Sequence, residues 1–413
     1  MSEAPELTQT SSTPKKSTSS VQDTVGRKAP FGSRYLTDED QVWSHNAWDH
    51  VPPPDDQGEI IAKALEKQKT NPVPSEEKAK YNDRPSRHWD NFYKMNASNF
   101  FKNRRWLNNE FPELIAGTKA GAGPFVVAEI GCGAGNSAYP LLTMNENPDL
   151  RIFAYDYSPH AVKLVQRNPL YESPPIGSIE AAVWDLSSPA GIPGNLEEGM
   201  VDVVVLVFVM SALHPNEWRQ AVENIHKILK PGGLVVLRDY GRYDLAQLRF
   251  KANRLLDDNF YIRGDKTRVY FFELDELSLL FTGQKASASE HASAETCIIE
   301  NEEESGNPDS APIGEQSITA ALADVHISSN TIAEEPTVTV SDHSPSDGTK
   351  LEAKVPMPEP MIHPNLMTLE DATTKPLFTT EQLGVDRRLL VNRKRQLKMY
   401  RVWMQGQFRK AIE

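Results

Sequence analysis

The sequence predicts an α/β fold in which helices cover both faces of a doubly wound, mostly parallel seven-stranded sheet. Three observations lead to this prediction. Five short β-rich runs alternate with helical stretches between residues 124 and 283. Most of these runs are continuously apolar or β-branched, which is typical of parallel strands that are buried on both faces. Two longer β-rich runs near the C-terminus are joined by a basic turn, and we expect them to complete the sheet as an antiparallel hairpin.

The elements of this sheet follow in order along the chain. Helical spacing between the runs is clearest in Glu217–Leu229, and Pro231-Gly232-Gly233 then turns the chain into the next run. The closing hairpin is expected at Gly384–Asn392 and Met399–Phe408, with its basic turn at Arg393–Lys398. The five expected parallel strands are Phe125–Ile130, Arg151–Tyr155, Ile179–Trp184, Val201–Val209 and Gly233–Arg238.

Composition divides the chain into segments. Residues 1–30 are polar and low in complexity, which predicts a disordered tail, whereas 31–123 form an aromatic and basic helical extension. We expect the sheet domain at 124–283 and 376–413, and an acidic, mostly disordered insertion at 284–375. Residues 284–360 contain no Phe, Trp or Tyr and carry a net charge of −12, from 15 acidic and 3 basic residues. The rest of the chain has a net charge of only −1, so a basic face for nucleic acid is compatible with the overall charge of −13.

Several classes of protein are disfavoured. Two cysteines, Cys132 and Cys297, exclude a disulfide framework and a Cys-rich zinc site, so we expect no metal. The longest apolar run, Val203–Leu213, is far shorter than the roughly 18–20 residues of a membrane span, and we expect no membrane association. The N-terminal residues lack the apolar stretch of a secretory signal. We therefore expect a cytoplasmic protein, with a mitochondrial presequence as the minority interpretation.

A glycine-rich turn follows the first expected strand. The run from Val127 to Asn136 reads VAEIGCGAGN, so Gly131 and Gly133 allow a tight turn and close approach of the backbone to a ligand. A dinucleotide-binding loop would place its third glycine at Asn136. The observed spacing, with Glu129 two residues before the first glycine, favours S-adenosylmethionine. The alternative is an ordinary turn from strand to helix.

Carboxylates and small polar residues follow the other strands, at the edge where doubly wound sheets bind ligands. Asp156 is suited to accept hydrogen bonds from two ribose hydroxyls, although a surface Asp at a strand end is the alternative. Asp185 is suited to accept the adenine amino group beside Leu186, but it is also a good helix N-cap. Ser211 and His214 follow the fourth expected strand, although His214 is as easily a capping residue. Asp239 follows the fifth.

Together these features resemble a class I S-adenosylmethionine-dependent methyltransferase, which has a Rossmann-like fold. A narrower resemblance, to the tRNA N(3)-methylcytidine methyltransferases, covers roughly 31–283 and 376–408. The motifs that carry it are WDNFYK at 89–94, NFFKNRRWL at 99–107, FVMSALHP at 208–215, RDYGRYD at 238–244 and MYRVW at 399–403. The acidic insertion is not a general feature of that family.

The resemblance implies a role for each matching residue. Gly131 approaches the amino-acid end of the cofactor, and Gly133 is a further cofactor-binding residue. Asp156 holds the ribose, and Asp185 and Leu186 hold the adenine. Further pocket residues implied in the same way are Val207, Trp89 and Tyr93. For Trp89 and Tyr93 the alternative is core packing, because they lie at i and i+4 of one helix.

The reaction implied is formation of 3-methylcytidine, typically at cytidine 32 in the anticodon loop of threonine- or serine-accepting tRNAs. The unprotonated N3 of cytosine attacks the sulfonium methyl in line, so positioning is the main catalytic contribution. The base must be unpaired or flipped out. Candidate groups that act on the cytosine are Ser211, His214 and Asp239. Besides tRNA, a tRNA synthetase or another accessory protein is a partner that the family sometimes requires.

Binding to RNA requires cations and stacking surfaces. Basic residues gather in three groups, although each group alone is as easily a solvated face. Two alternatives remain open: a methyltransferase of this fold that acts on a protein or small molecule, and a non-catalytic RNA-binding scaffold. Salt dependence distinguishes the substrates: binding to RNA should weaken steeply as the salt concentration rises, whereas binding to a small molecule should not. The candidate RNA contacts are Lys102, Arg104 and Arg105; Arg263 and Arg268; and Arg387, Arg388, Arg393, Lys394 and Arg395.

Overall fold

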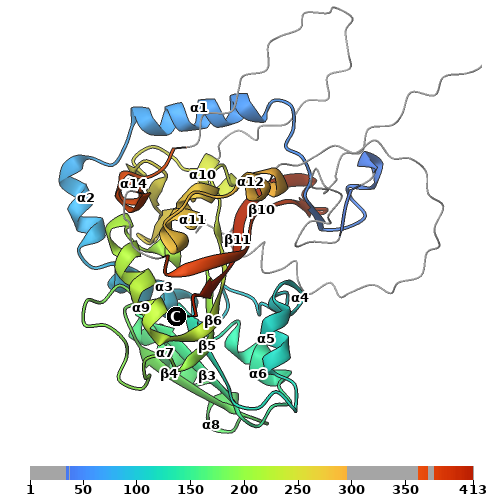
Figure 1. The fold of residues 1–413 in the computed structure, drawn as a ribbon. Helices are drawn as coiled ribbons and strands as arrows, with labels where there is room; N and C mark the ends of the chain where they lie inside the picture. The colour runs from blue at the N-terminus through green and yellow to red at the C-terminus, as the bar shows by residue number, and fades with distance from the viewer. Residues whose placement is uncertain (1–33, 37, 295–360, 371–375, 413) are drawn as a thin grey trace, which may run out of the picture.

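The computed structural model describes residues 34–36, 38–294, 361–370 and 376–412 (Figure 1). Its main feature is an eight-stranded sheet in the order β1-β10-β11-β6-β5-β2-β3-β4. Strands β6, β5, β2, β3 and β4 run parallel to one another, while β11, β10 and β1 are added antiparallel. The strands are β1 (Ala47–Asp49), β2 (Phe125–Ile130), β3 (Leu150–Asp156), β4 (Ser178–Val183), β5 (Val201–Val207), β6 (Leu229–Tyr240), β10 (Phe378–Asn392) and β11 (Leu397–Lys410).

The predicted doubly wound α/β fold is confirmed, and all seven predicted strands are present. Two details differ. Strand β6 already begins at Leu229, which pairs with Val201 before a register shift, so the Pro-Gly-Gly segment lies within the strand. The eighth strand, β1, comes from the N-terminal extension and pairs with β10. It has only three residues, too few for a hydrophobic period to reveal it.

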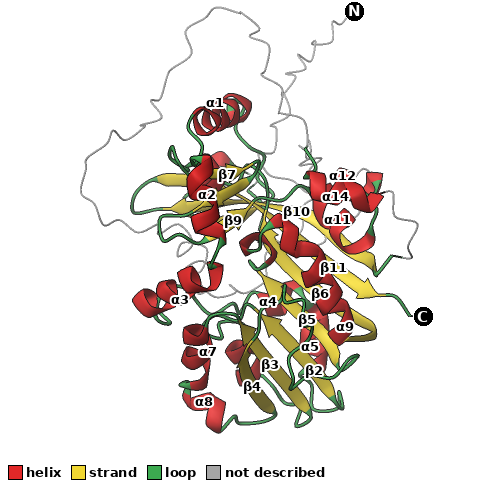
Figure 2. Cartoon of the chain, turned by 90° about the vertical axis from the view of Figure 1, so that its left-hand side faces the viewer, coloured by secondary structure: helices red, strands yellow, loops and turns green. Residues whose placement is uncertain are grey.

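Helices lie on both sides of this sheet (Figure 2), and alternate residues of each strand contact them. On one face Ala128, Val204 and Val235 pack with the helix that contains Trp218 and Ile225. The residues between them in the strands, such as Val127, Val205 and Val236, pack on the other face against the helices next to the glycine-rich turn. This arrangement explains why the strands read as continuous apolar runs. The helices after β2 are α6 (Ala138–Thr143), α7 (Pro159–Gln166), α8 (Pro169–Glu172), α9 (Trp218–Ile228), α10 (Leu245–Leu248) and α11 (Leu274–Thr282).

The N-terminal extension is helical, as predicted, and one of its helices lies over the carboxyl end of β3. Asp90 accepts hydrogen bonds from the Ser158 hydroxyl at 3.0 Å and from the His160 amide at 2.9 Å, at the start of α7. These bonds place the apolar side of α3 next to the glycine loop. The helices are α1 (Gln57–Thr70), α2 (Ser75–Asn82), α3 (Pro85–Asn96), α4 (Leu107–Glu110) and α5 (Pro112–Gly117).

A second sheet was not predicted. It has three short antiparallel strands, β7 (Leu255–Asp257), β8 (Phe260–Ile262) and β9 (Arg268–Tyr270). Helix α1 is joined to this region through Gln68, which donates to the Gln247 carbonyl and accepts from the Tyr261 hydroxyl, both at 2.8 Å. The turn between β8 and β9 faces α3, so the extension and this small sheet enclose the edge of the large sheet.

Two helices occupy the ends of the segment predicted as a mostly disordered insertion, α12 (Ala288–Ala294) and α14 (Pro364–Glu370). Both are joined to α11. His291 lies 2.9 Å from Asp275, and the His363 amide donates to Glu276 at 2.8 Å. The segment 284–375 thus contains a helix near each end, and disorder of the rest stays a prediction. Residues 295–360 and 371–375 of that segment, and the predicted disordered tail at 1–30, lie outside the described residues.

Candidate active site

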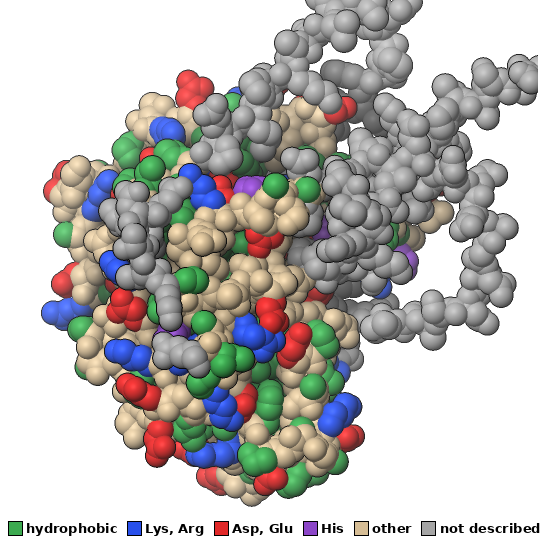
Figure 3. All heavy atoms as spheres, in the orientation of Figure 1, with side chains coloured by type: hydrophobic (Ala, Val, Ile, Leu, Met, Phe, Trp, Pro, Cys, Tyr) green, Lys and Arg blue, Asp and Glu red, His purple; other side chains and the backbone are tan. Residues whose placement is uncertain are grey.

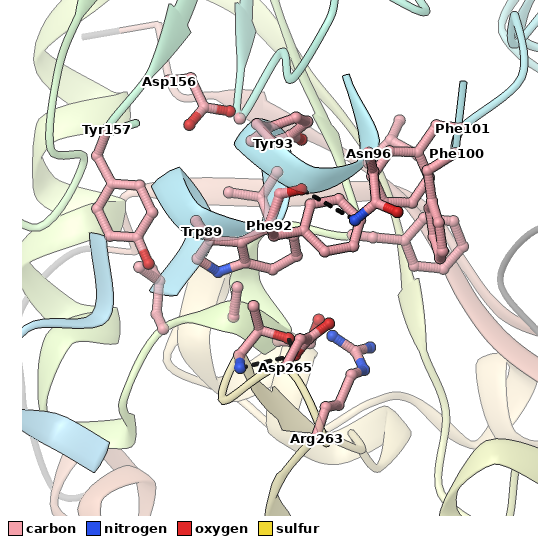
Figure 4. A pocket seen from close by; sticks show the side chains of 18 of the residues that line it. Trp89, Phe92, Tyr93, Asn96, Phe100, Phe101, Asp156, Tyr157, Arg263 and Asp265 are labelled. Atoms are coloured by element: carbon pink, nitrogen blue, oxygen red, sulfur yellow. Dashed lines mark hydrogen bonds between the residues drawn. The ribbon is translucent and has the colours of Figure 1, made fainter. Parts of the chain in front are cut away.

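A cavity of about 480 Å³ opens at the carboxyl ends of the parallel strands. Its walls come from residues that end or follow β2, β3, β4, β5 and β6, from α3 and the segment after it, and from the β8–β9 turn. In Figure 4, Trp89, Phe92 and Tyr93 of α3 lie on one side of the cavity, and Arg263 and Asp265 of the turn lie opposite. The edge of the sheet that was predicted to bind a ligand is thus enclosed on several sides.

The glycine turn forms a cradle that side chains would fill. Gly131 and Gly133 have φ values of 66° and 55°, a region that glycine adopts far more readily than other residues. A Cβ atom at Gly131 would lie 2.6 Å from the Val209 side chain, and one at Gly133 would lie 2.4 Å from the Tyr93 hydroxyl. Gly131 lines the cavity, whereas Gly133 lies behind it and supports Asp156.

Asp156 lines the cavity at the end of β3 and is held by two backbone amides. Gly133 N donates to one carboxylate oxygen at 3.0 Å, and Ser158 N donates to the other at 2.9 Å. Burial raises the pKa of Asp156 to about 6. A carboxylate has about four acceptor sites, so two sites remain for hydroxyl donors of a ligand.

Asp185 and Leu186 follow β4 and line the same cavity as Trp184 and Tyr157. Asp185 also accepts hydrogen bonds from the Ser187 amide at 2.9 Å and the Ser187 hydroxyl at 2.8 Å. These bonds close a turn and not a helix, because the structure describes every residue between β4 and β5 and has no helix there, so Asp185 is not a helix N-cap.

Trp89 and Tyr93 form part of an aromatic wall on α3. Their rings stack with centroids 6.2 Å apart, and Phe92 meets Phe100 edge-to-face at 4.9 Å (Figure 4). The core-packing alternative holds for Tyr93, which is buried, but both Trp89 and Tyr93 also line the cavity. Val207, at the end of β5, lines it as well.

Arg104 has a different position from the one expected. It was predicted to contact RNA, but its side chain is only 12% exposed and lines the cavity, with Nη1 3.9 Å from Glu129 Oε1. Glu129 is fully buried, and burial raises its pKa to about 7. Sequence reasoning missed this pairing, since Arg104 lies among exposed cations in the sequence. The Arg104 guanidinium lies near the glycine cradle and is therefore suited to hold an anionic group.

Of the three residues expected to act on the substrate, Ser211 alone lines the cavity. Asp239 is completely buried and accepts the Ser211 amide at 3.0 Å, so it positions the Ser211 turn. His214 caps the short helix that follows it: its Nδ1 accepts the Asn216 amide at 3.2 Å, and its own amide donates to Glu217 at 2.6 Å. The capping alternative is the one observed for His214.

The residues expected to contact RNA divide into buried and exposed groups. Arg268 is 2% exposed and pairs with Glu217 at 3.0 Å, and Arg388 is enclosed by three carboxylates. Both guanidinium groups are paired with carboxylates inside the fold, and their contact with RNA stays a prediction. Arg387 and Arg263 are half-buried, and Arg263 lines the cavity. The exposed members are Lys102, Arg105, Arg393, Lys394 and Arg395.

The surface that Figure 3 shows has basic and acidic side chains interspersed, with no large patch of one sign. Among the described helices, none is long and apolar enough to cross a membrane. Within the same residues, no cluster of three or more His, Cys, Asp or Glu side chains is arranged to hold a metal ion.

Comparison with known proteins gives consistent matches. A family model described as a methyltransferase domain matches residues 128–235. The tRNA(Thr) (cytosine(32)-N(3))-methyltransferase of Saccharomyces cerevisiae is 40% identical over 387 residues, which cover 93% of this chain and 46% of that protein. The chain thus spans about half the length of that relative.

Two other relatives are matched over most of their length. The tRNA N(3)-methylcytidine methyltransferase trm140 of Schizosaccharomyces pombe is 48% identical over 268 residues, which cover 65% of this chain and 85% of that protein. The tRNA N(3)-cytidine methyltransferase METTL2 of Danio rerio is 38% identical over 286 residues, which cover 62% of this chain and 80% of that protein.

Proposed function

Because this chain belongs to the family of tRNA N(3)-methylcytidine methyltransferases, we propose that it methylates N3 of cytidine 32 in the anticodon loop of threonine- or serine-accepting tRNA. The observation that carries the proposal is the cavity, in which the glycine cradle and the buried Asp156 meet a wall of aromatic side chains. When bound, S-adenosylmethionine supplies a methyl group on a positively charged sulfur.

The residues around the cavity fit this cofactor. Gly131 lines the cavity, and its lack of a side chain lets a ligand approach the backbone closely there. Asp156 retains acceptor sites for ribose hydroxyls, and Asp185 and Leu186 lie at the end of the neighbouring strand for the adenine. Arg104, near the cradle, suits the carboxylate of the amino-acid end.

The chain's own contribution to the reaction is positioning and exclusion of water. Cytosine N3 is already a nucleophile at neutral pH, so the protein needs no general base to remove a proton. Orientation of two bound reactants can supply about 7–11 kcal/mol of the barrier reduction. Trp89 and Phe92 of α3 cover one side of the cavity, and the base enters from an unpaired loop.

The test is methylation of total tRNA by the purified protein with labelled S-adenosylmethionine, followed by nucleoside analysis. We expect 3-methylcytidine as the product, located at position 32 by fragment analysis. A product on another base, or on protein, would contradict the proposed substrate. If no RNA product forms although cofactor binding is normal, adding cell extract distinguishes a missing partner from a wrong substrate.

We also predict that the exposed turn between β10 and β11 contacts RNA phosphates. Replacing Arg393, Lys394 and Arg395 together by Ala removes three exposed cations without touching the cavity. Each lost phosphate contact reduces the slope of log affinity against log salt by roughly 0.7–0.9, so we expect a reduction of about 2 and weaker tRNA binding at moderate salt.

The control removes the same charge elsewhere. Lys63, Lys67 and Lys69 are exposed on α1, and changing all three to Ala should affect the salt slope less. Equal effects of the two triple variants would mean that net charge, and not this turn, governs binding. Binding is measured by titration of labelled tRNA at several salt concentrations.

A further inference from the structure

Phe208 has an unusual backbone conformation at the centre of the cavity. It follows Val207, the last residue of β5, and its φ is +60°. A bulky side chain rarely adopts this left-handed region, and such outliers persist only where surrounding structure enforces them. Here the Phe208 amide donates to the Arg238 carbonyl of β6 at 2.8 Å. The Phe208 side chain lines the cavity.

The ring of Phe208 packs against two other aromatic side chains. Tyr240, at the end of β6, lies 4.7 Å away at an interplanar angle of 40°, and Trp403 of β11 lies 6.3 Å away, edge-on. Both supporting side chains are buried, whereas Phe208 is half-buried and lines the cavity. The ring is therefore fixed in place and still presents surface to a ligand.

The order of strands shows which ligand this surface would meet. Asp185, Asp156 and Gly131 follow β4, β3 and β2, and the next strands in the sheet are β5 and β6. If the cofactor extends from adenine to amino acid along β4, β3 and β2, then Phe208 lies beyond it on the β5–β6 side. That is the side left for the acceptor base.

The acceptor changes charge during the reaction. The lone pair of cytosine N3 becomes the new nitrogen–carbon bond, the electron pair of the broken bond stays on the donor sulfur, and no proton moves. The base therefore becomes a cation that is shared between its ring and its exocyclic amine. An aromatic face attracts a cation more than a neutral ring, so its contribution grows toward the transition state.

We propose that the target cytosine lies against the ring of Phe208, which stabilises the positive charge that the base acquires. The inference rests on the proposed function. Three other charged side chains lie near this wall. On the β8–β9 turn, Arg263 and Asp265 carry opposite charges (Figure 4), and the Arg104 guanidinium, which is also beside Glu129, lies over the Phe208 ring at 6.0 Å from its centroid.

The experiment replaces Phe208 by 4-fluoro-, 3,5-difluoro- and 3,4,5-trifluorophenylalanine, which weaken the electrostatic attraction of the ring while nearly keeping its size. Single-turnover methylation of an anticodon stem-loop is measured for each protein, together with the affinities for the RNA and for S-adenosylhomocysteine. We expect the rate to fall progressively with fluorine content, by about 3- to 30-fold over the series. Both affinities should stay within about twofold, because the attraction grows only as the cation forms.

Two comparisons complete the design. The same fluorinated series at Phe281, a buried residue that stacks on Phe408 outside the cavity, should leave the rate unchanged. Phe208→Leu, which keeps an apolar side chain but no aromatic face, should lose at least as much rate as the trifluorinated protein.

The outcomes separate the two proposals. A rate that is constant across the Phe208 series, or a loss confined to RNA affinity, overturns the role of the ring while the proposed function stands. If the wild-type protein transfers no methyl group to cytidine even when cell extract is added, the proposed function fails, and the inference falls with it.

Discussion

Asp156→Ala is expected to abolish measurable cofactor binding while the protein remains folded. The carboxylate of Asp156 has acceptor sites open to the cavity, and hydrogen bonds to a charged group contribute about 1.5–3 kcal/mol each. Loss of two such bonds to ribose hydroxyls weakens binding by about 3–6 kcal/mol, or roughly a hundredfold to ten-thousandfold. Calorimetric titration with S-adenosylhomocysteine measures the change.

The matched control is Asp156→Asn, which keeps an acceptor oxygen for one of the two backbone amides, Gly133 N or Ser158 N. It should bind the cofactor more weakly than wild type but unfold at a higher temperature than the Ala variant. In the Ala variant both amides lose their acceptor, at about 1–3 kcal/mol for each buried group. Normal cofactor affinity in a folded Ala variant would refute the assignment of Asp156.

The pH dependence of the wild type gives a second check on the same residue. Because burial raises the pKa of Asp156 to about 6, cofactor affinity should be constant above that value and decline as the pH falls through it. The contribution of Asp156 to folding stability depends on pH in the opposite direction. A carboxyl whose folded pKa is raised holds its proton more tightly in the folded state, so this group destabilises the fold as the pH rises toward 6. Glu129, whose pKa is about 7, titrates nearby, and the Asn variant separates the two.

The comparison of sequence and structure shows why some elements could be predicted. Strands β2, β3, β5 and β6 lie inside the sheet, so burial on both faces makes each of them a largely continuous apolar run. The glycine loop and the strand-end carboxylates Asp156 and Asp185 could be placed because chain direction in a parallel sheet brings them to one edge. Local sequence determines these features.

Other features depend on contacts between distant segments. Arg388 and Arg393 stand in one basic stretch of sequence, yet only the fold shows that the first is enclosed by carboxylates and the second is exposed. Arg104 likewise meets Glu129 only when α3 and its following segment fold over the glycine loop. The backbone of Phe208 has no signal in the sequence, since its φ is imposed by the neighbouring strand.

The contrast between Arg388 and Arg393 predicts a large effect of Arg388 on the free energy of unfolding. Arg388 lies between β10, β1 and α4, with its guanidinium 2.9 Å from Asp386, 3.2 Å from Asp49 and 3.0 Å from Glu110. Burial alone would lower the pKa of Arg388, but these carboxylates raise it well above its usual range. The guanidinium therefore joins the N-terminal extension to the closing hairpin.

Arg388→Met should destabilise the protein severely, because it removes the charge while keeping most of the side-chain volume. Removing one partner of a buried ion pair leaves the other uncompensated, which costs about 3–5 kcal/mol. For an ordered region of this size we expect a fall of roughly 10 °C in the melting temperature. Thermal unfolding followed by circular dichroism measures it.

The matched variant is Arg393→Met, five residues further along the same chain segment but exposed to solvent. Its melting temperature should change little, since exposed substitutions usually alter stability by within about 0.5 kcal/mol. The two variants should have opposite phenotypes: Arg388→Met loses stability, and Arg393→Met loses tRNA affinity in a stable protein. Equal stability of the two variants would mean that Arg238, which contacts Asp386 at 2.5 Å, compensates the charge of Asp386 fully without Arg388. In that case β1 and α4 would be held to the hairpin by apolar packing, such as that of Trp48 against Leu389, and not by the buried charges.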